Sequence, residues 1–453
     1  MGAFHAYDIR GVFGVDFDGA TAYKVGFFLP ELLSADKILV GRDCRLSSDE
    51  IHDRLVEGIT DAGADVCDLG LSTTPMVYFG TADYGFKASV QITASHNPAQ
   101  YNGMKVSREN ALPVGLDNGL GQIQEWIESG RECRPAAVKG TVHRMDIHQE
   151  YLSFLMKYKE DLGGLKIAMD LSNGMATLYA REIFGDAPSY IFDTMDGRFP
   201  NHEPNPLVPA NVRALQELVR RTGADVGVIY DGDADRVMFV DENARFISPD
   251  LMIAVLGHYF LEEKGEKGIV LQDIRSSKAV GEYLVPMGAE MRTWKVGRAF
   301  AARKLREIDG VYGGELAGHY YFRDFFYSDS GLLASILILN VVAKMKSRGI
   351  SLSSLISRIE KYRNSGEINF RVEDKQGAMD AVRDHFMSEE KPSAYMDFDG
   401  YRVEFPDWWF NIRPSNTEPY LRFICEATSD TLLQEKTDAV KTLLSSRFGA
   451  VLG

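Results

Sequence analysis

One local pattern recurs along the first two thirds of the chain and constrains its fold more than any other feature. In each copy a helical stretch stops at a glycine and an apolar β-type run follows: DAGADVCDLG (61–70), RTGADVGVIYDGD (221–233) and PMGAEMRTWKVG (286–297). Gly63, Gly223 and Gly288 suit the left-handed position that ends a helix, because glycine adopts positive φ without steric cost. Alternating helices and strands of this kind predict α/β units with largely parallel strands.

The length and the later pattern predict four domains. A chain of 453 residues is too long for one hydrophobic core. Further apolar strands are expected at 37–41, 166–171 and 268–273. These repeats suggest three related α/β domains with mixed, mostly parallel sheets, at 1–145, 146–245 and 246–360. The remaining residues, 361–453, predict a C-terminal α+β domain with strands near 367–372, 401–405, 408–413 and 420–427 and a helix near 430–447.

Composition excludes several classes of protein. The net charge of −15 argues against nucleic-acid binding, which needs a basic surface for phosphates. The four cysteines are far apart and form no disulfide or zinc pattern, which favours the cytoplasm. The start lacks a signal-peptide pattern, and the longest apolar run, 331–343, is too short for a bilayer. We expect a cytoplasmic protein with no membrane contact, and a buried helix at 331–343.

The segment FKASVQITASHNP predicts a strand over 86–92 that leads into a loop, with Ser95 at its mouth. Ser95 is a candidate nucleophile for phosphoryl transfer. The alternative is that Ser95 or Thr93 caps a following helix. Acyl hydrolysis is disfavoured, because no G-x-S-x-G elbow is present and His96 would point away from Ser95 in an extended chain.

A second segment, VGVIYDGDADRVMFVDE, places Asp231, Asp233 and Asp235 at alternate positions between two β-type runs. Three carboxylates suit a hard divalent cation such as Mg²⁺ that also holds a phosphate oxygen. Arg236 beside them is suited to stabilise a transferring phosphoryl group. A solvated hairpin turn is the alternative. An EF-hand is excluded, because Arg236 replaces the required glycine and the flanks are strands.

Two further loops carry polar groups. VYGGELAGHYYF holds Glu315, suited to accept bonds from sugar hydroxyls, and His319, suited to exchange a proton. Its glycines, at 313, 314 and 318, are expected to let the backbone approach a ligand. In WFNIRPSNTEPYLRF a phosphate cradle is expected from these side chains: Arg413, Ser415, Asn416 and Thr417. Alone, each of the two loops is more typical of an ordinary turn.

The four loops together resemble a known family. TASHNPAQYNGMK, DGDADR, GELAGH and RPSNTEP are similar, in order, to the signature loops of the α-D-phosphohexomutases, and FHAYDIRG resembles the opening of the phosphomannomutase/phosphoglucomutase branch. The resemblance spans residues 7–422 and implies four domains around a central cleft. It implies an isomerase that interconverts mannose 6-phosphate and mannose 1-phosphate through a phosphoserine and a hexose 1,6-bisphosphate, and that also accepts glucose phosphates. Mg²⁺, a bisphosphate activator and a monomer or homodimer are implied too.

The resemblance also implies roles. Ser95 would be the phosphoserine and would bind Mg²⁺ together with Asp231, Asp233 and Asp235. Lys105 and His319 would be candidates for proton transfer or for orienting the reacting hydroxyl. The residues implied to stabilise the phosphoryl group are Arg10, His96 and Arg236. Glu315 would bind sugar hydroxyls, and the cradle would hold the second phosphate. Weaker correspondences in the cleft are Tyr7, Arg275, Lys295 and Gly297.

Three positions depart from the family pattern: Ala317 stands where serine is usual, Arg298 where histidine is frequent, and His5 where arginine is usual. Ala317 bears on hexose preference, Arg298 and His5 bear on phosphate or sugar affinity, and all three leave the chemistry at Ser95 intact. Phosphoglucosamine mutase, a metal-dependent sugar phosphatase and a non-catalytic sugar-phosphate sensor are the alternatives. The first is disfavoured by Asn416, where that branch has glycine, and by the opening motif. The sensor is disfavoured by the intact serine and aspartates.

Overall fold

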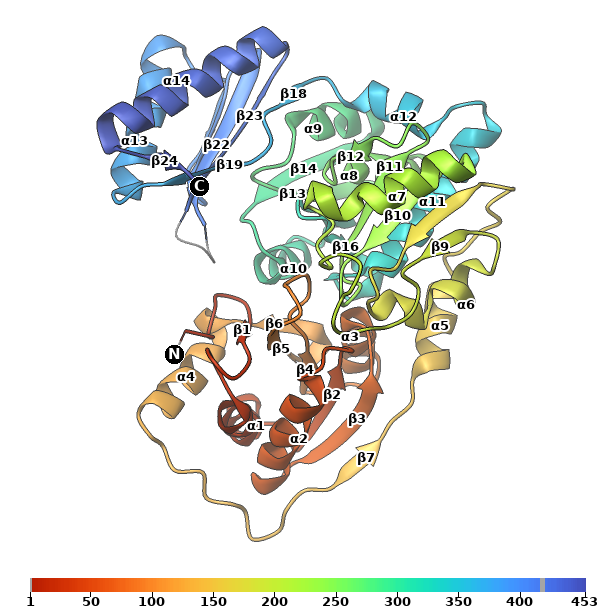
Figure 1. Cartoon of the computed structure of the whole chain (residues 1–453), viewed down its shortest axis with the longest axis vertical. Coiled ribbons are helices and arrows are strands. Elements are labelled where there is room, and N and C mark those ends of the chain that lie inside the picture. Colours follow the sequence, from red (N-terminus) through yellow and green to blue (C-terminus); the bar gives the residue numbers. More distant parts are fainter. Residues whose placement is uncertain (1, 416–419) are drawn as a thin grey trace.

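The computed structural model describes residues 2–415 and 420–453, which form four successive sheets with helices packed on them (Figure 1). In Figure 1 the first unit, red to orange, lies below; the second and third lie side by side above it; and the blue C-terminal unit lies beyond the third. We call them units one to four. In the described part of the chain, no helix combines the length and the apolar character needed to cross a membrane.

Unit one has the strand order β1-β5-β4-β2-β3-β7, with β6 beside β5. Its elements are β1 (Ile9–Val12), α1 (Gly19–Leu33), β2 (Lys37–Arg42), α2 (Ser48–Asp61), β3 (Asp65–Leu71), α3 (Thr74–Asp83), β4 (Ala88–Ile92), β5 (Tyr101–Arg108), β6 (Leu112–Val114), α4 (Leu120–Glu128) and β7 (Val142–Arg144). Side chains of β2 alternate between two cores: Ile38 and Val40 share one with α1 and α2, and Leu39 shares the other with α3.

Unit two has the order β12-β11-β10-β8-β9. Its elements are α5 (His148–Met156), β8 (Ile167–Asp170), α6 (Ala180–Phe184), β9 (Ser189–Ile191), α7 (Pro209–Thr222), β10 (Val226–Tyr230), β11 (Val237–Asp241) and β12 (Phe246–Ile247). The strands β10, β8 and β9 are parallel, whereas β10, β11 and β12 pair antiparallel. The turn between β10 and β11 therefore joins two strands, which excludes an EF-hand there.

Unit three has the order β14-β13-β15-β16-β17. Its elements are α8 (Leu251–Gly257), β13 (Gly268–Asp273), α9 (Lys278–Leu284), β14 (Ala289–Trp294), α10 (Arg298–Glu307), β15 (Tyr312–Gly314), β16 (Tyr320–Phe322), β17 (Ser328–Asp329), α11 (Gly331–Ser347) and α12 (Leu352–Ile359). The buried helix expected at 331–343 is confirmed as α11. Gly63, Gly223 and Gly288 all have positive φ where helices end, which confirms the repeated pattern.

Unit four is antiparallel, in the order β20-β21-β22-β23-β19-β24 with β18 beside β23. Its elements are β18 (Arg363–Asn364), β19 (Ile368–Arg371), α13 (Lys375–Glu389), β20 (Ala394–Met396), β21 (Tyr401–Glu404), β22 (Trp408–Pro414), β23 (Leu421–Ala427), α14 (Asp430–Phe448) and β24 (Val451–Leu452). The four strands and one helix expected here are confirmed, and α13 was not predicted. Trp408, Phe410 and Ile412 join the core under α13 and α14. The alternate residues of β22 face the other way.

Candidate active site

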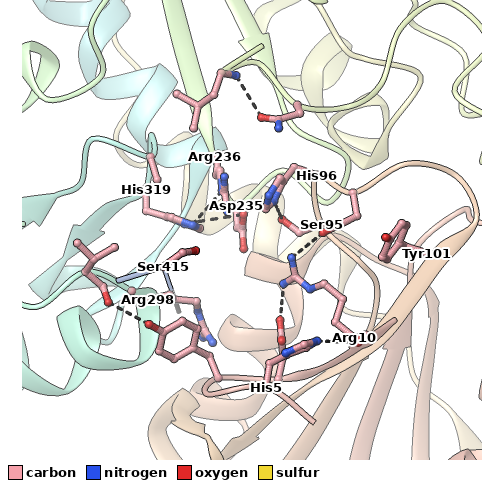
Figure 2. Close-up of a pocket in the computed structure, with 18 of the residues that line it drawn as sticks. His5, Arg10, Ser95, His96, Tyr101, Asp235, Arg236, Arg298, His319 and Ser415 are labelled. Atoms are coloured by element: carbon pink, nitrogen blue, oxygen red, sulfur yellow. Dashed lines mark hydrogen bonds and ion pairs between the residues drawn. The ribbon is translucent and has the colours of Figure 1, made fainter. Parts of the chain in front are cut away.

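A cavity of about 650 Å³ opens where loops of the four units meet. The predicted residues that line it are Tyr7, Arg10, Ser95, His96, Lys105, Asp235, Arg236, Arg275, Gly297, Glu315, His319, Arg413 and Ser415. Lys295 is not among the lining residues; its Nζ lies 5.6 Å from the centre of the Phe300 ring. Asn416 and Thr417 lie outside the described residues. Figure 2 shows Ser95 and His96 of unit one facing Asp235, Arg236 and His319.

Ser95 is buried in the loop between β4 and β5, with a left-handed backbone at φ 52°. A strand follows this loop, so the alternative that Ser95 or Thr93 caps a helix is wrong; Thr93 Oγ1 instead accepts from Ser95 N at 2.9 Å. The left-handed turn brings His96 Nδ1 to 3.4 Å from Ser95 Oγ. The expectation that His96 points away assumed an extended chain and is also wrong. Burial, then the charges of Arg236 and Arg10, hold the pKa of His96 well below its usual range.

Three carboxylates meet the Ser95 hydroxyl in the turn between β10 and β11. Ligand oxygens of Asp231, Asp233 and Asp235 lie within 4.8 Å of one another. Ser95 Oγ donates to Asp231 Oδ2 at 2.9 Å. A Cβ at position 232 would lie 2.5 Å from the Ser95 carbonyl oxygen, so Gly232 permits this close approach of the two loops. Burial, then the charges of Asp235 and Asp233, raise the pKa of Asp231 well above its usual range.

The same nest has the donor set of a divalent-cation site. Among the described residues, the buried Asp233 Oδ1 and Asp235 Oδ1 have no hydrogen-bond partner. Their Oδ2 atoms accept from Lys105 Nζ at 2.7 and 2.5 Å. Burial alone would lower the pKa of Lys105, but Asp233 and Asp235 outweigh it and raise that pKa, so Lys105 is an ammonium. Two buried carboxylate oxygens without a hydrogen-bond partner fit a hard cation.

His319 lies between Arg236 and Asp329. Arg236 Nε donates to His319 Nε2 at 2.9 Å, and His319 Nδ1 lies 2.6 Å from Asp329 Oδ2. Because a guanidinium only donates, Nε2 is the acceptor and Nδ1 carries the proton. Arg298 Nε also donates to Asp329, at 2.9 Å. Burial would raise the pKa of Asp329, but Arg298 and His319 outweigh it and lower that pKa to about 2.

Asp235 also belongs to a second set of possible metal ligands. Asp235, His319 and Asp329 also lie close enough together to hold an ion. The Nδ1 proton of His319 occupies the nitrogen that faces Asp329, however. The Asp231, Asp233 and Asp235 group, with its unpartnered oxygens, is therefore the better metal site.

Glu315 lies in the loop between β15 and β16, and its Oε1 accepts from Gly297 N at 2.8 Å. Gly297 has φ 123°, and a Cβ there would lie 2.6 Å from the Tyr7 ring, so only glycine fits. Tyr7 Oη donates to the Val296 carbonyl at 3.1 Å. Ala317 lines the cavity beside these groups and offers no hydroxyl. The loop that carries Glu315 thus has one hydrogen-bonding group fewer than the family pattern.

The glycines of this loop are constrained by the protein's own packing. A Cβ on Gly313 would lie 2.7 Å from Leu271 Cβ, and one on Gly314 would lie 2.7 Å from Ile253 Cγ1. Packing inside unit three therefore requires glycine at both positions, and the close approach of a ligand stays a prediction. Gly318, with φ 84°, forms the turn.

Two guanidinium groups lie close together at the unit-four side of the cavity. Arg275 Nη2 donates to Asp273 Oδ2 at 2.8 Å, and Arg413 Nη1 lies 3.5 Å from Asp399 Oδ1. Burial, then the charge of Arg275, lower the pKa of Arg413. A bound phosphate dianion would offset both the burial and the repulsion. This part of the cavity suits an anion.

The two other departures from the family pattern also face the cavity. Arg298 has its guanidinium carbon 4.0 Å from the centre of the Tyr78 ring and pairs with Asp329. His5 Nε2 lies 3.1 Å from the Arg10 carbonyl oxygen. Arg298 therefore bears on the position of His319, through Asp329, as well as on the ligand.

Three residues of the site were missed by sequence reasoning. Asp329 orients His319, Thr74 Oγ1 donates to Asp233 Oδ2 at 2.5 Å, and Arg45 supports the Ser95 loop. Asp329 and Thr74 carried no sequence signal. Arg45 had a weak one, because it follows the carboxyl end of β2, and ligands of parallel sheets bind at that edge.

Comparison with known proteins gives concordant matches over the whole chain. Models of phosphoglucomutase/phosphomannomutase match in four parts: alpha/beta/alpha domain I at residues 1–132, domain II at 149–244, domain III at 248–362 and the C-terminal domain at 367–443. A phosphomannomutase from Escherichia coli is 37% identical, over 97% of this chain and 98% of its own. One from Methanocaldococcus jannaschii is 35% identical, over 98% and 97%. A solved phosphoglucomutase/phosphomannomutase family protein from Burkholderia thailandensis superposes with a TM-score of 0.87 at 29% identity, over 100% and 99%.

Proposed function

The chain belongs to the phosphoglucomutase/phosphomannomutase family, and from this premise we propose that it is a phosphomannomutase that interconverts mannose 6-phosphate and mannose 1-phosphate. Glucose phosphates are proposed as further substrates. One observation carries the proposal: the buried Ser95 hydroxyl donates to Asp231 at 2.9 Å, inside a cavity that all four units line. The enzyme is an isomerase, and its reaction moves a phosphoryl group within a hexose phosphate.

In the proposed reaction the bond between phosphorus and Ser95 Oγ breaks as the phosphorus bonds to the free hydroxyl of a bound hexose monophosphate. The hydroxyl proton leaves to a base, Ser95 Oγ takes up a proton as it leaves phosphorus, and a hexose 1,6-bisphosphate forms. The bisphosphate then reverses its orientation and returns its other phosphoryl group to Ser95. Lys105 and Arg236 carry positive charge beside the transferring group, which supports the stabilising role of Arg236 and suits Lys105 to orient the reacting hydroxyl rather than to accept its proton. Water must be excluded from the site, since it would hydrolyse the phosphoserine and release inorganic phosphate.

The proposed metal is Mg²⁺, held by Asp231, Asp233 and Asp235 together with an oxygen at Ser95. When bound, it neutralises charge on the phosphoryl oxygens. Its support is the pair of unpartnered carboxylate oxygens in the nest. A hexose 1,6-bisphosphate is proposed as the activator that first phosphorylates Ser95.

The remaining roles follow the electrostatics of the cavity. Glu315 is proposed to accept bonds from sugar hydroxyls, and Arg275 and Arg413 to bind the non-reacting phosphate together with Ser415. Asn416 and Thr417 are assigned to the same cradle. His319 is a candidate for proton transfer once Arg236 releases Nε2, because that nitrogen is otherwise occupied. The domain limits near 145, 245 and 360, the cytoplasmic location and a monomeric or homodimeric state stay predictions.

The test is to follow the purified protein with mannose 1-phosphate, Mg²⁺ and a trace of glucose 1,6-bisphosphate by phosphorus NMR, and then to repeat it with glucose 1-phosphate. Growth of a 6-phosphate signal is expected with both sugars, and its rate ranks them. Growth of inorganic phosphate would instead identify a phosphatase, and turnover of glucosamine phosphate alone would identify the amino-sugar mutase. Ser95→Ala is expected to abolish turnover; a variant that retains it would refute the phosphoserine route.

A further inference from the structure

Arg45 lies just beyond the end of β2, and its side chain is completely buried beneath the loop that carries Ser95. The guanidinium donates to four backbone carbonyl oxygens of this loop: those of Ser95 at 2.9 Å, Asn97 at 2.7 Å, Pro98 at 2.7 Å and Tyr101 at 3.0 Å. One side chain therefore supplies the hydrogen-bond donors for both ends of the loop.

The remaining donor of Arg45 is also used. Its Nε donates to Asp43 Oδ2 at 3.1 Å, and Asp43 Oδ1 accepts from Arg45 N at 3.0 Å and from Ser48 Oγ at 2.6 Å. The ring of Phe199, from unit two, lies 4.9 Å from the guanidinium carbon. A guanidinium has five N–H groups, and these contacts engage all of them. Arg45 is therefore positioned by its surroundings and has no donor left for a substrate.

The loop needs such support because of its backbone. Ser95 is a non-glycine residue in the left-handed region, which persists only where the surroundings impose it. The four carbonyl oxygens point at one place, where they would repel one another and lack donors without a cation. The left-handed turn in turn sets the direction of Ser95 Oγ toward Asp231.

We propose that Arg45 is a positioning residue for phosphoryl transfer, which holds the loop 95–101 so that Ser95 Oγ faces the metal nest. The inference rests on the proposed mutase activity for its kinetic consequences, but the geometry of the loop stands independently of the substrate. Since Arg45 does not touch the ligand, its loss acts on the chemical step and leaves substrate binding nearly unchanged.

The test compares Arg45→Lys with the wild type. A lysine has one ammonium group and cannot reach four carbonyl oxygens and Asp43 together. A displacement of a reacting group by about 1 Å can cost about 100-fold in rate, so kcat is expected to fall about 100-fold while KM changes less than about threefold. Hydrogen exchange of the peptide spanning residues 93–103 is expected to accelerate. The matched control is Arg54→Lys on α2, whose side chain is 41% exposed and pairs with Glu57, and both readouts should match the wild type.

The outcomes separate this inference from the proposed function. A wild type that is inactive on hexose phosphates would refute the proposed function. The hydrogen-exchange measurement alone would then test whether Arg45 holds the loop. An Arg45→Lys enzyme with wild-type kcat and exchange, or one in which only KM rises, would overturn the inference. If Arg45→Lys does not fold, Asp43→Asn replaces it: this variant removes the partner of Nε, and a smaller fall in kcat in the same direction is expected. An unchanged kcat there would also overturn the proposal.

Discussion

Replacing Arg402 by methionine is expected to lower the stability of unit four by about 3 kcal/mol. The side chain is 1% exposed and donates to the carbonyl oxygens of Ile274 at 2.8 Å and Ser276 at 2.6 Å, both in unit three. It also pairs with Glu404 at 2.6 Å. Removing one partner of a buried ion pair costs about 3 to 5 kcal/mol. Since Glu404 remains 18% exposed, water partly compensates, and the lower end of that range applies.

The same change is expected to weaken substrate binding. The two carbonyl groups held by Arg402 flank Arg275, whose guanidinium lines the cavity. Once they are released, the hydrogen bond from Arg275 to a phosphate loses its fixed geometry. A charge-assisted hydrogen bond contributes about 1.5 kcal/mol or more, so KM should rise about tenfold.

Tryptophan fluorescence in a urea titration measures the first effect. Trp408 and Trp409 lie within unit four, and the ring centre of Trp294 in unit three lies 5.4 Å from that of Phe398 across the joint. Arg371→Met, on the exposed side of β19, is the control and should unfold like the wild type. If Arg402→Met unfolds at the same urea concentration as the wild type and has the same KM, the idea that Arg402 joins the two units is refuted.

Three further predictions concern the metal nest, His319 and the joint. Chelation by EDTA is expected to stop turnover, and added Mg²⁺ is expected to restore it; full activity in EDTA would contradict the metal site. Asp231→Asn removes a charged ligand, so calorimetry should show Mg²⁺ binding about tenfold weaker or more. Asp329→Asn should lower kcat about 100-fold with little change in KM, because an amide can present either N–H or oxygen to His319 Nδ1 and so no longer fixes its tautomer. Asp329→Glu should recover part of the activity, and a pure KM effect would contradict this role. Burial, then the charge of Asp250, raise the pKa of Glu426 from 4.5 to about 7. The folded pKa exceeds the unfolded one, so stability is lost as pH rises from about 4.5 to about 7, by about 3 kcal/mol in all. Between about pH 5 and about pH 8 the free energy of unfolding of the wild type should therefore fall relative to that of Glu426→Gln. Parallel plots of unfolding free energy against pH for the two proteins would contradict the assignment.

The sequence predicts those parts of the fold that depend on neighbouring residues. A glycine that ends a helix acts through its own φ angle, so Gly63, Gly223 and Gly288 were identifiable without a structure. The order of the strands depends on distant pairings instead. In unit one, β5 is inserted antiparallel between β1 and β4, and no local pattern of residues indicates that position.

The same distinction applies to the site. Ser95 and the three aspartates lie in compact motifs, whereas Asp329 reaches His319 only because β17 pairs with β16. Arg45 is similar, since its four acceptors are backbone carbonyls, which every sequence has. The conformation of Ser95 could not be predicted either, because the support of a buried guanidinium imposes the left-handed backbone. Functional side chains are thus visible in the sequence, and the groups that orient them are not.

The placement of the apolar cores argues which unit moves during the reaction. One core runs without interruption through units one, two and three and includes α3, α5 and α11, whereas unit four has a separate core. Its joint with unit three has the Trp294–Phe398 ring pair and several polar contacts. Arg402 donates to carbonyl oxygens, Glu426 Oε2 accepts from Ser277 Oγ at 2.6 Å, and Lys278 Nζ donates to the Phe405 carbonyl at 3.0 Å. A polar joint can exchange its bonds with water, whereas a continuous apolar core cannot open without exposing it. The proposed bisphosphate must reverse its orientation between two transfers at Ser95. We therefore expect the proposed phosphoserine and metal nest to be the fixed part of the site, and rotation of unit four to be the motion that gives the proposed intermediate room to turn.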